Sequence, residues 1–149
     1  MDFLIPEATR EAWHSLLLEQ GYVLFHSSGA FSQYESASSA SGLPPLDLMA
    51  VDVGTWEKLF AAAETERFAD GYLAHWPAPL HLVALKLHAW RGVFREEKEQ
   101  DWSDVLGVIQ QCGIDIHGES FREIALRYGG PEALVRFGLA PPAEPEPHR

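Results

Sequence analysis

Short apolar stretches separated by turn-forming residues characterise the first half of the chain, a pattern typical of β-strands. Segments of this kind lie at 2–5, 22–26, 31–34 and 46–53. In the last segment, Leu46, Leu48 and Ala50 alternate with Asp47, Met49 and Val51. Because side chains alternate between the two faces of a strand, this pattern predicts a strand with one apolar face. The segments 22–26 and 31–34 are expected to form a hairpin, and one or two short strands are expected within 68–76.

Helical spacing of apolar residues dominates most of the remaining chain. Helices are predicted at 7–20, 54–63, 80–90, 101–111, 120–128 and 131–137. Pro6 suits the first turn of the first helix, and Gly21 suits the position just after its end. The apolar stripe of the first helix is expected at Trp13, Leu16, Leu17 and Gln20, and that of 101–111 at Trp102, Val105, Leu106 and Ile109. The segment 80–90 is apolar nearly all round, which predicts a buried helix.

Strands therefore dominate the first half of the chain and helices the second. This distribution predicts an α/β (α+β) fold with a small mixed sheet flanked by helices and further helices towards the C-terminus. The 149 residues have the size of one domain, which we place at 1–138. The segment 139–149 contains a run rich in Pro and Glu and is expected to be a disordered tail. The small polar segment 36–42 (SASSASG) is expected to be a loop.

Charge and composition narrow the possible function classes. The formal net charge is −11, with 22 acidic residues against 11 Lys and Arg, so general nucleic-acid binding is not expected. Binding of one nucleotide through metal ions, or of a basic partner protein, is compatible with this charge. The sequence has no apolar run long enough to span a bilayer, no secretory signal and one cysteine, Cys112, so we expect a cytoplasmic protein without membrane association.

Two carboxylates lie on or beside predicted strands, and they are the first candidates for chemistry. Asp2 precedes the apolar Phe-Leu-Ile stretch, and Asp47 lies early in the strand 46–53. Carboxylates on neighbouring strands can hold Mg²⁺ together with the phosphates of a nucleotide, as metal-assisted phosphoryl transfer requires. The alternative is that the end of a strand simply carries polar residues.

Lys86 is the second candidate, because it lies in the middle of an apolar helix, where lysine is uncommon. It is expected either to contact a phosphate or orient a metal-binding carboxylate, or to form an ion pair with Asp101 or Asp104. Those two acids are three residues apart at the predicted start of the helix 101–111, where acids commonly cap the free N–H groups.

The remaining reactive side chains give weak signals. His81 and His88 are seven residues apart on one predicted helix, with His75 before them, but no cysteine or nearby acid completes a zinc-like spacing. Cys112 has no neighbours typical of a nucleophile. The sequence also lacks a standard glycine-rich phosphate loop.

Four segments, taken in order, resemble motifs of the AbiEii/AbiGii-type (minimal) nucleotidyltransferase family. MDFLIPE resembles the end of the strand that carries the family's D-x-D pair, and PLDLM resembles the later strand with the third carboxylate. PLHLVALKLHAWRG resembles the helix that carries a lysine, and EKEQDWSDVLGVI resembles the acidic helix that follows it. The likeness extends over roughly residues 1–135, and it implies a nucleotidyltransferase-like sheet with helices at its C-terminal side.

The resemblance also implies roles for individual residues. Asp2 corresponds to the second acid of the D-x-D pair and Asp47 to the third carboxylate, so both are expected to bind Mg²⁺. Lys86 corresponds to the lysine that supports the nucleotide site, and Asp101 to the acid of the following helix, with Asp104 after it. Family members include toxins that transfer nucleotides from a nucleoside triphosphate under the control of an antitoxin.

Two features of the family pattern are not found in this sequence: the G-S or G-G turn before the D-x-D pair, and the first acid of that pair. Three interpretations are open. The start of an active enzyme lies upstream; the chain is a non-catalytic relative that acts through protein contacts; or a partner chain completes the sheet, for example in a homodimer through an exposed strand edge. Whether the chain is an enzyme is therefore left open.

Overall fold

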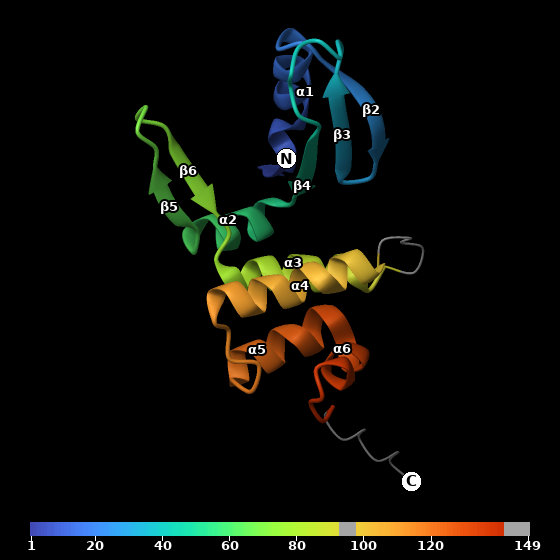
Figure 1. Cartoon of the computed structure of the whole chain (residues 1–149), viewed down its shortest axis with the longest axis vertical. Coiled ribbons are helices and arrows are strands. Elements are labelled where there is room, and N and C mark those ends of the chain that lie inside the picture. The colour runs from blue at the N-terminus through green and yellow to red at the C-terminus, as the bar shows by residue number, and fades with distance from the viewer. Residues whose placement is uncertain (93–97, 142–149) are drawn as a thin grey trace. The chain divides into compact units, whose positions relative to one another are not determined.

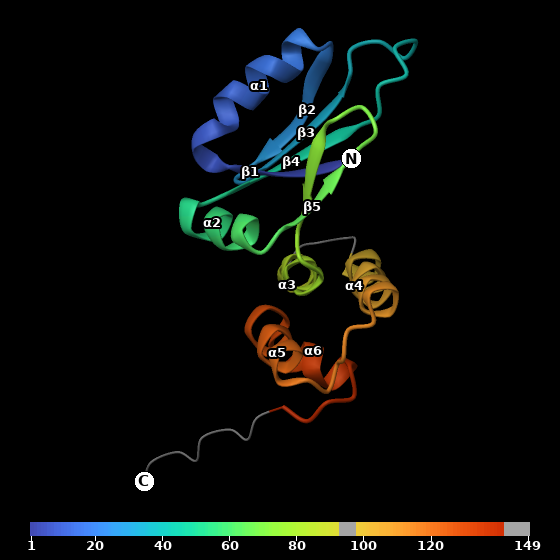
Figure 2. The same cartoon turned by 90° about the vertical axis from the view of Figure 1, so that its left-hand side faces the viewer.

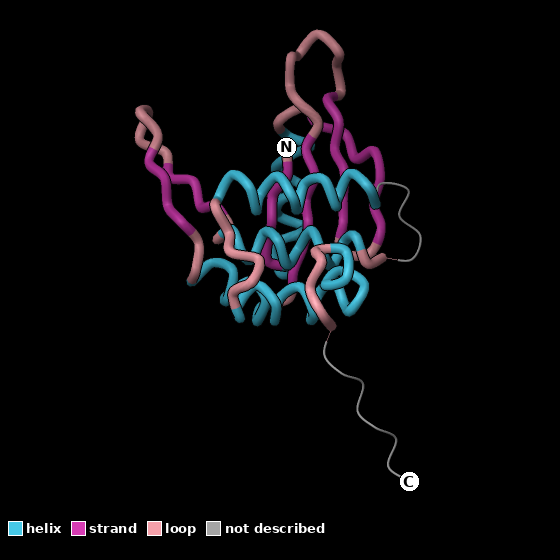
Figure 3. The backbone as a smooth tube through the Cα atoms, turned by 60° about the horizontal axis from the view of Figure 1, so that its bottom comes forward, coloured by secondary structure: helices cyan, strands magenta, loops and turns pink. Residues whose placement is uncertain are grey.

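The structure combines helices and strands, which confirms the predicted mixed α/β class (Figure 3). All the strands lie before residue 77, and helices dominate the described chain after it. The structure is a computed structural model that describes residues 1–92 and 98–141. Contacts within the chain divide it into two compact units, Met1–Ala61 and Ala62–Arg149.

A four-stranded sheet forms the centre of the first unit (Figure 1). Its strands are β1 (Asp2–Pro6), β2 (Tyr22–Ser28), β3 (Phe31–Ser36) and β4 (Leu46–Val51), in the order β1-β4-β3-β2. β1 is parallel to β4, whereas β3 pairs antiparallel with both β4 and β2. The predicted hairpin and the predicted mixed sheet are thus confirmed.

The helix α1 (Arg10–Glu19) covers one face of this sheet and follows a short 3₁₀ turn, η1 (Glu7–Thr9) (Figure 2). The core between helix and sheet consists of Ile5, Leu17, Tyr22, Tyr34, Leu46, Leu48 and Ala50, with Trp13 packed against it. Leu17 is buried as expected, but the expected stripe is wrong at Leu16, whose side chain is 45% exposed. A hydrogen bond of 2.9 Å between His14 Nδ1 and the Tyr34 hydroxyl also joins the helix to the sheet.

β4 ends two residues earlier than predicted, because Asp52 begins the next helix, α2 (Val53–Ala61). The carboxylate of Asp52 accepts hydrogen bonds from the backbone N–H and the hydroxyl of Thr55, at 3.0 and 2.6 Å. These hydrogen bonds, led by that of the hydroxyl, lower the pKa of Asp52. Asp52 therefore caps the N-terminus of α2 and does not belong to the strand.

The second unit opens with an antiparallel hairpin of β5 (Glu64–Arg67) and β6 (Leu73–Trp76). One or two short strands were expected within 68–76; β6 lies there, whereas β5 lies before this range. Residues 68–72 form the turn instead, closed by backbone hydrogen bonds between Phe68 and Tyr72 and from Gly71 to Phe68. Gly71 has a φ of +92°, which suits this turn because glycine lacks a Cβ.

Helices dominate the rest of the described residues of the second unit. They are α3 (Pro79–Trp90), α4 (Lys98–Cys112), α5 (Glu119–Ile124), the π-helical segment η2 (Ala125–Gly129) and α6 (Gly130–Arg136). The single helix predicted at 120–128 is thus divided between α5 and η2. α4 begins no later than Lys98, three residues before the predicted start, so Asp101 lies within the helix.

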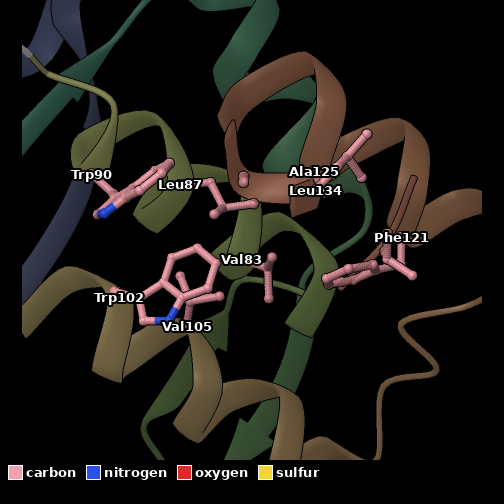
Figure 4. Packing of buried hydrophobic residues seen from close by; sticks show 10 residues of the cluster. Val83, Leu87, Trp90, Trp102, Val105, Phe121, Ala125 and Leu134 are labelled. Carbon is pink, nitrogen blue, oxygen red and sulfur yellow. The ribbon is translucent and has the colours of Figure 1, made fainter. Parts of the chain in front are cut away.

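Apolar side chains from all these helices form one core (Figure 4). Its buried members are Val83, Leu87, Trp90, Trp102, Val105, Phe121, Ala125, Ala133, Leu134 and Leu139. Leu106 was expected on the buried face of α4, but its side chain is 45% exposed. Leu139, at the start of the expected tail, is buried at 5% exposure, and 142–149 of that tail lie outside the described residues.

Two contacts hold α4, η2 and α6 to this core at short range. A Cβ added at Gly129 would lie 2.4 Å from the Cβ of Ala133 and 3.3 Å from Cδ2 of Leu87, so only glycine allows this approach. The guanidinium of Arg136 lies 4.5 Å from the ring centre of Trp102 and donates two hydrogen bonds to Glu99, at 3.2 and 2.6 Å. This hydrogen bonding is the main cause of the lowered pKa of Glu99.

No helix within residues 1–92 and 98–141 is long and apolar enough to cross a bilayer.

Replacement of two leucines of the second unit by alanine should lower the free energy of unfolding by different amounts. Leu87→Ala removes a fully buried side chain and leaves a cavity, so the free energy of unfolding should fall by about 2–5 kcal/mol. Leu106→Ala is the matched control, because that side chain is 45% exposed, and it should change this free energy by less than about 1 kcal/mol. Chemical denaturation followed by circular dichroism measures both, and equal losses would contradict the assignment of this core.

Candidate functional site

Asp2 and Asp47 lie side by side on the parallel strands β1 and β4. They are partners in the strand register, and the backbone N–H of Asp47 donates a hydrogen bond of 2.8 Å to the carbonyl of Met1. Partners on neighbouring strands share a face of the sheet, so both carboxylates emerge on the same side. The pair that the sequence suggested is therefore brought together within the first unit.

The face that carries this pair is the one opposite α1. Along β4, Leu46 and Leu48 point into the core and are buried, whereas Asp47 between them points to the other face and is half-buried. Asp2, at the end of the sheet edge, has a side chain that is 78% exposed. One carboxylate is thus set into the sheet surface and the other lies open beside it.

The row of polar side chains continues beyond the two carboxylates. In the register, Asp47 pairs with Gln33 of β3, and Gln33 pairs with His26 of β2. Each of the four strands therefore contributes one polar residue at the same level: Asp2, Asp47, Gln33 and His26. We call these four residues the polar row.

Sequence reasoning missed Gln33 and His26. Neither belongs to a recognisable motif, and their alignment with Asp47 depends on strand pairing between distant segments. A β-bulge between Leu24 and His26 also shifts the register of β2, so simple alternation along that strand does not show which face His26 occupies. The packing of its ring against Phe31, at 6.5 Å between centroids, places it on the face opposite α1.

The two carboxylates suit a hard divalent cation. Adjacent strands are about 4.8 Å apart, a spacing at which two carboxylates can share one metal ion. Within the described residues, no group of three or more His, Cys, Asp or Glu side chains could hold a metal ion. Asp2 and Asp47 would thus supply two ligands, and water and substrate phosphates would supply the others, as is common for Mg²⁺.

In the second unit, Lys86 of α3 forms an ion pair with Asp104 of α4. The Lys86 ammonium donates a hydrogen bond of 2.7 Å to Asp104 Oδ2, and the Gln100 amide donates one of 2.8 Å to Asp104 Oδ1. The hydrogen bond from Lys86 is the main cause of the lowered pKa of Asp104. Of the two acids that the sequence offered as a partner for Lys86, the structure shows Asp104.

Asp101 is buried at 3% exposure, one helical turn before Asp104. Asp101 lies in the first turn of α4, as expected for both acids, whereas Asp104 lies further along the helix because α4 already includes Lys98. A buried carboxylate is rare on a helix, and it distinguishes Asp101 from the exposed acids around it.

The weak signals from histidine and cysteine do not combine into a site in the described part of the chain. His75 lies 3.1 Å from the Thr65 hydroxyl on the exposed hairpin, and His88 is exposed. Cys112 is exposed at the end of α4. Their arrangement gives no reason to add them to the candidate site.

The candidate residues therefore form two groups, the polar row in the first unit and Lys86, Asp104 and Asp101 in the second. No protein-family model matches the chain, and a search of curated proteins likewise finds no match. The likeness to the AbiEii/AbiGii-type family therefore stays a prediction.

The Lys86–Asp104 pair predicts a pH-dependent contribution to stability. Lys86→Met should lower the free energy of unfolding by about 1–2 kcal/mol near neutral pH, since it leaves Asp104 without its cation. Because the pKa of Asp104 is held below its ordinary 3.8 in the folded chain, this contribution is present above that value and is lost as pH falls through the folded-state pKa. The difference between the native chain and Asp104→Asn should likewise shrink below about pH 4.

Lys58→Met is the matched control for this experiment, because Lys58 is an exposed lysine of α2. It should leave the free energy of unfolding nearly unchanged at every pH. Urea titrations at several pH values measure all three variants. An equal effect of Lys58→Met and Lys86→Met would show that the ion pair contributes nothing specific.

Proposed function

We propose that this chain carries the nucleotide-binding scaffold of a metal-dependent nucleotidyltransferase of the AbiEii/AbiGii type. The observation that carries the proposal is the parallel register that places Asp2 beside Asp47 on one face of the sheet. This is the position in which two acids on neighbouring strands can bind Mg²⁺ and the phosphates attached to it. The order of the four resembling segments supports the same conclusion.

In this proposal, Asp2 and Asp47 would hold Mg²⁺, which would neutralise the phosphates of a nucleoside triphosphate. The metal also explains how a chain with a net charge of −11 can bind an anionic ligand. Lys86 is assigned to nucleotide support and Asp101 to the acidic helix, both by resemblance to the family. For Lys86 this role requires that the ammonium leave Asp104 or serve both groups.

The proposal extends to the biological setting of the family. By the same resemblance, this chain would be a cytoplasmic, toxin-like protein whose activity an antitoxin partner controls. It would not bind nucleic acids in general. A complete catalytic cycle needs acidic ligands in addition to Asp2 and Asp47, which a partner chain would supply.

A second candidate function is that of a non-catalytic interaction module, and the edges of the sheet favour it. β1 and β2 are the outer strands, and on β2 the side chains of Val23, Leu24 and Phe25 are 46, 43 and 65% exposed. An edge strand with exposed apolar residues can pair with a strand of another chain, including a second copy. Solution scattering of the purified chain would show a dimer in that case and a monomer otherwise.

Calorimetric titration tests the proposed function directly. Nucleoside triphosphates with Mg²⁺ should bind the native chain, and Asp47→Asn should weaken this binding at least about tenfold, since it removes a metal ligand. Glu19→Gln is the control: it removes an exposed carboxylate on α1, the helix that covers the opposite face of the sheet. Its affinity should equal that of the native chain.

Two results would contradict the proposal. One is the absence of binding at millimolar nucleotide and Mg²⁺, which would favour the interaction module. The other is equal weakening by Asp47→Asn and Glu19→Gln, which would mean that only the overall charge of the chain matters.

A further inference from the structure

We propose that Gln33 and His26, the second half of the polar row, bind the nucleobase of the nucleotide whose phosphates Asp2 and Asp47 bind through Mg²⁺. This inference rests on the proposed function and adds two residues to its site. No resemblance suggested them, and they follow only from the strand register, in which His26 pairs with Gln33 and Gln33 with Asp47.

The dimensions of the row suit one nucleotide. Strands are about 4.8 Å apart, so His26 lies roughly 10 Å from Asp47, two strands away across the sheet. A nucleotide with its phosphates at one end of the row would extend over β3 and place its base near the other end. The row therefore has two carboxylates for the metal-bound phosphates at one end and a side-chain amide and an imidazole for the base at the other.

An aromatic and apolar surface adjoins the end of the row that carries Gln33 and His26. The ring of Phe31 lies 6.5 Å from the ring of His26, with 47° between their planes. In the register, Phe31 pairs with Met49, and Met49 pairs with Leu4, so a row of apolar side chains runs parallel to the polar row on the same face. Aromatic rings of this kind bind bases by stacking.

The hydrogen-bonding groups of Gln33 and His26 are not used within the described residues. The side chain of Gln33 is half-buried, yet no hydrogen bond joins its side-chain amide to another described residue. The imidazole of His26 likewise forms no hydrogen bond with a described residue, and its ring packs against Phe31. By contrast, the neighbouring Ser27 and Ser32 hydroxyls lie 3.3 Å apart and bond to each other. A side-chain amide offers a donor and an acceptor side by side, which matches the edge of a base.

The test compares a nucleotide with its phosphates alone. ATP and inorganic tripolyphosphate, each with Mg²⁺, are titrated calorimetrically into the native chain and into His26→Ala and Gln33→Leu. ATP should bind the native chain at least about tenfold more tightly than tripolyphosphate, because stacking and base contacts add to affinity. In both variants this advantage should largely disappear, while the affinity for tripolyphosphate stays unchanged.

His117→Ala and Gln20→Leu are the matched controls, because they change an exposed histidine and an exposed glutamine that lie outside the polar row. They should leave both affinities unchanged. Circular dichroism spectra and melting curves verify that each variant is folded. His26→Ala, at an exposed position, keeps the test valid if Gln33→Leu disturbs the sheet.

The outcomes separate this inference from the proposed function. If both ligands bind the native chain equally, or if the variants leave the advantage of ATP intact, the proposed function stands and the role of Gln33 and His26 is wrong. If neither ligand binds, or if binding does not depend on Asp47, both proposals are overturned.

Discussion

The parallel pairing of β1 with β4 is the constraint on which the first unit depends. This pairing joins the first strand of the chain to β4, which follows the complete α1–β2–β3 segment, and it adds β1 as an outer strand of the sheet. Because side chains alternate along a strand, a slip by one residue would turn Asp2 to the core face and Phe3 away from it. The same register that buries Ile5 beside Ala50 therefore also aligns Asp2 with Asp47 and produces the polar row.

The second unit depends on a different interaction, the packing of aromatic side chains between helices. Trp102 lies 5.1 Å from Trp90 and 4.6 Å from Phe137, measured between ring centroids, and Arg136 covers its face. This packing fixes the orientation of α4, and the orientation determines which acid reaches Lys86. Asp104 forms a partly exposed ion pair with Lys86, whereas Asp101, which looks like a surface charge in the sequence, is buried.

Local patterns could be predicted from the sequence, and pairings between distant segments could not. The alternation from Leu46 to Val51 depends only on neighbouring residues, and the structure confirms it. The place of Asp47 beside Gln33 and His26 depends on strand order and on the bulge in β2, neither of which has a local signal. Likewise, the sequence offered Asp101 and Asp104 as equal partners for Lys86, because the start of α4 and its packing were not predictable.

In the proposed function, Asp2 and Asp47 form one cation site at the carboxylate end of the polar row. Nuclear magnetic resonance of the ¹⁵N-labelled chain with small amounts of Mn²⁺, a paramagnetic substitute for Mg²⁺, tests it most directly. If the two carboxylates bind the ion together, the amide signals of Asp2, Asp47 and Gln33 should broaden first, and Asp47→Asn should remove this preference. Broadening spread evenly over the exposed acids, or unchanged in Asp47→Asn, would contradict the claim.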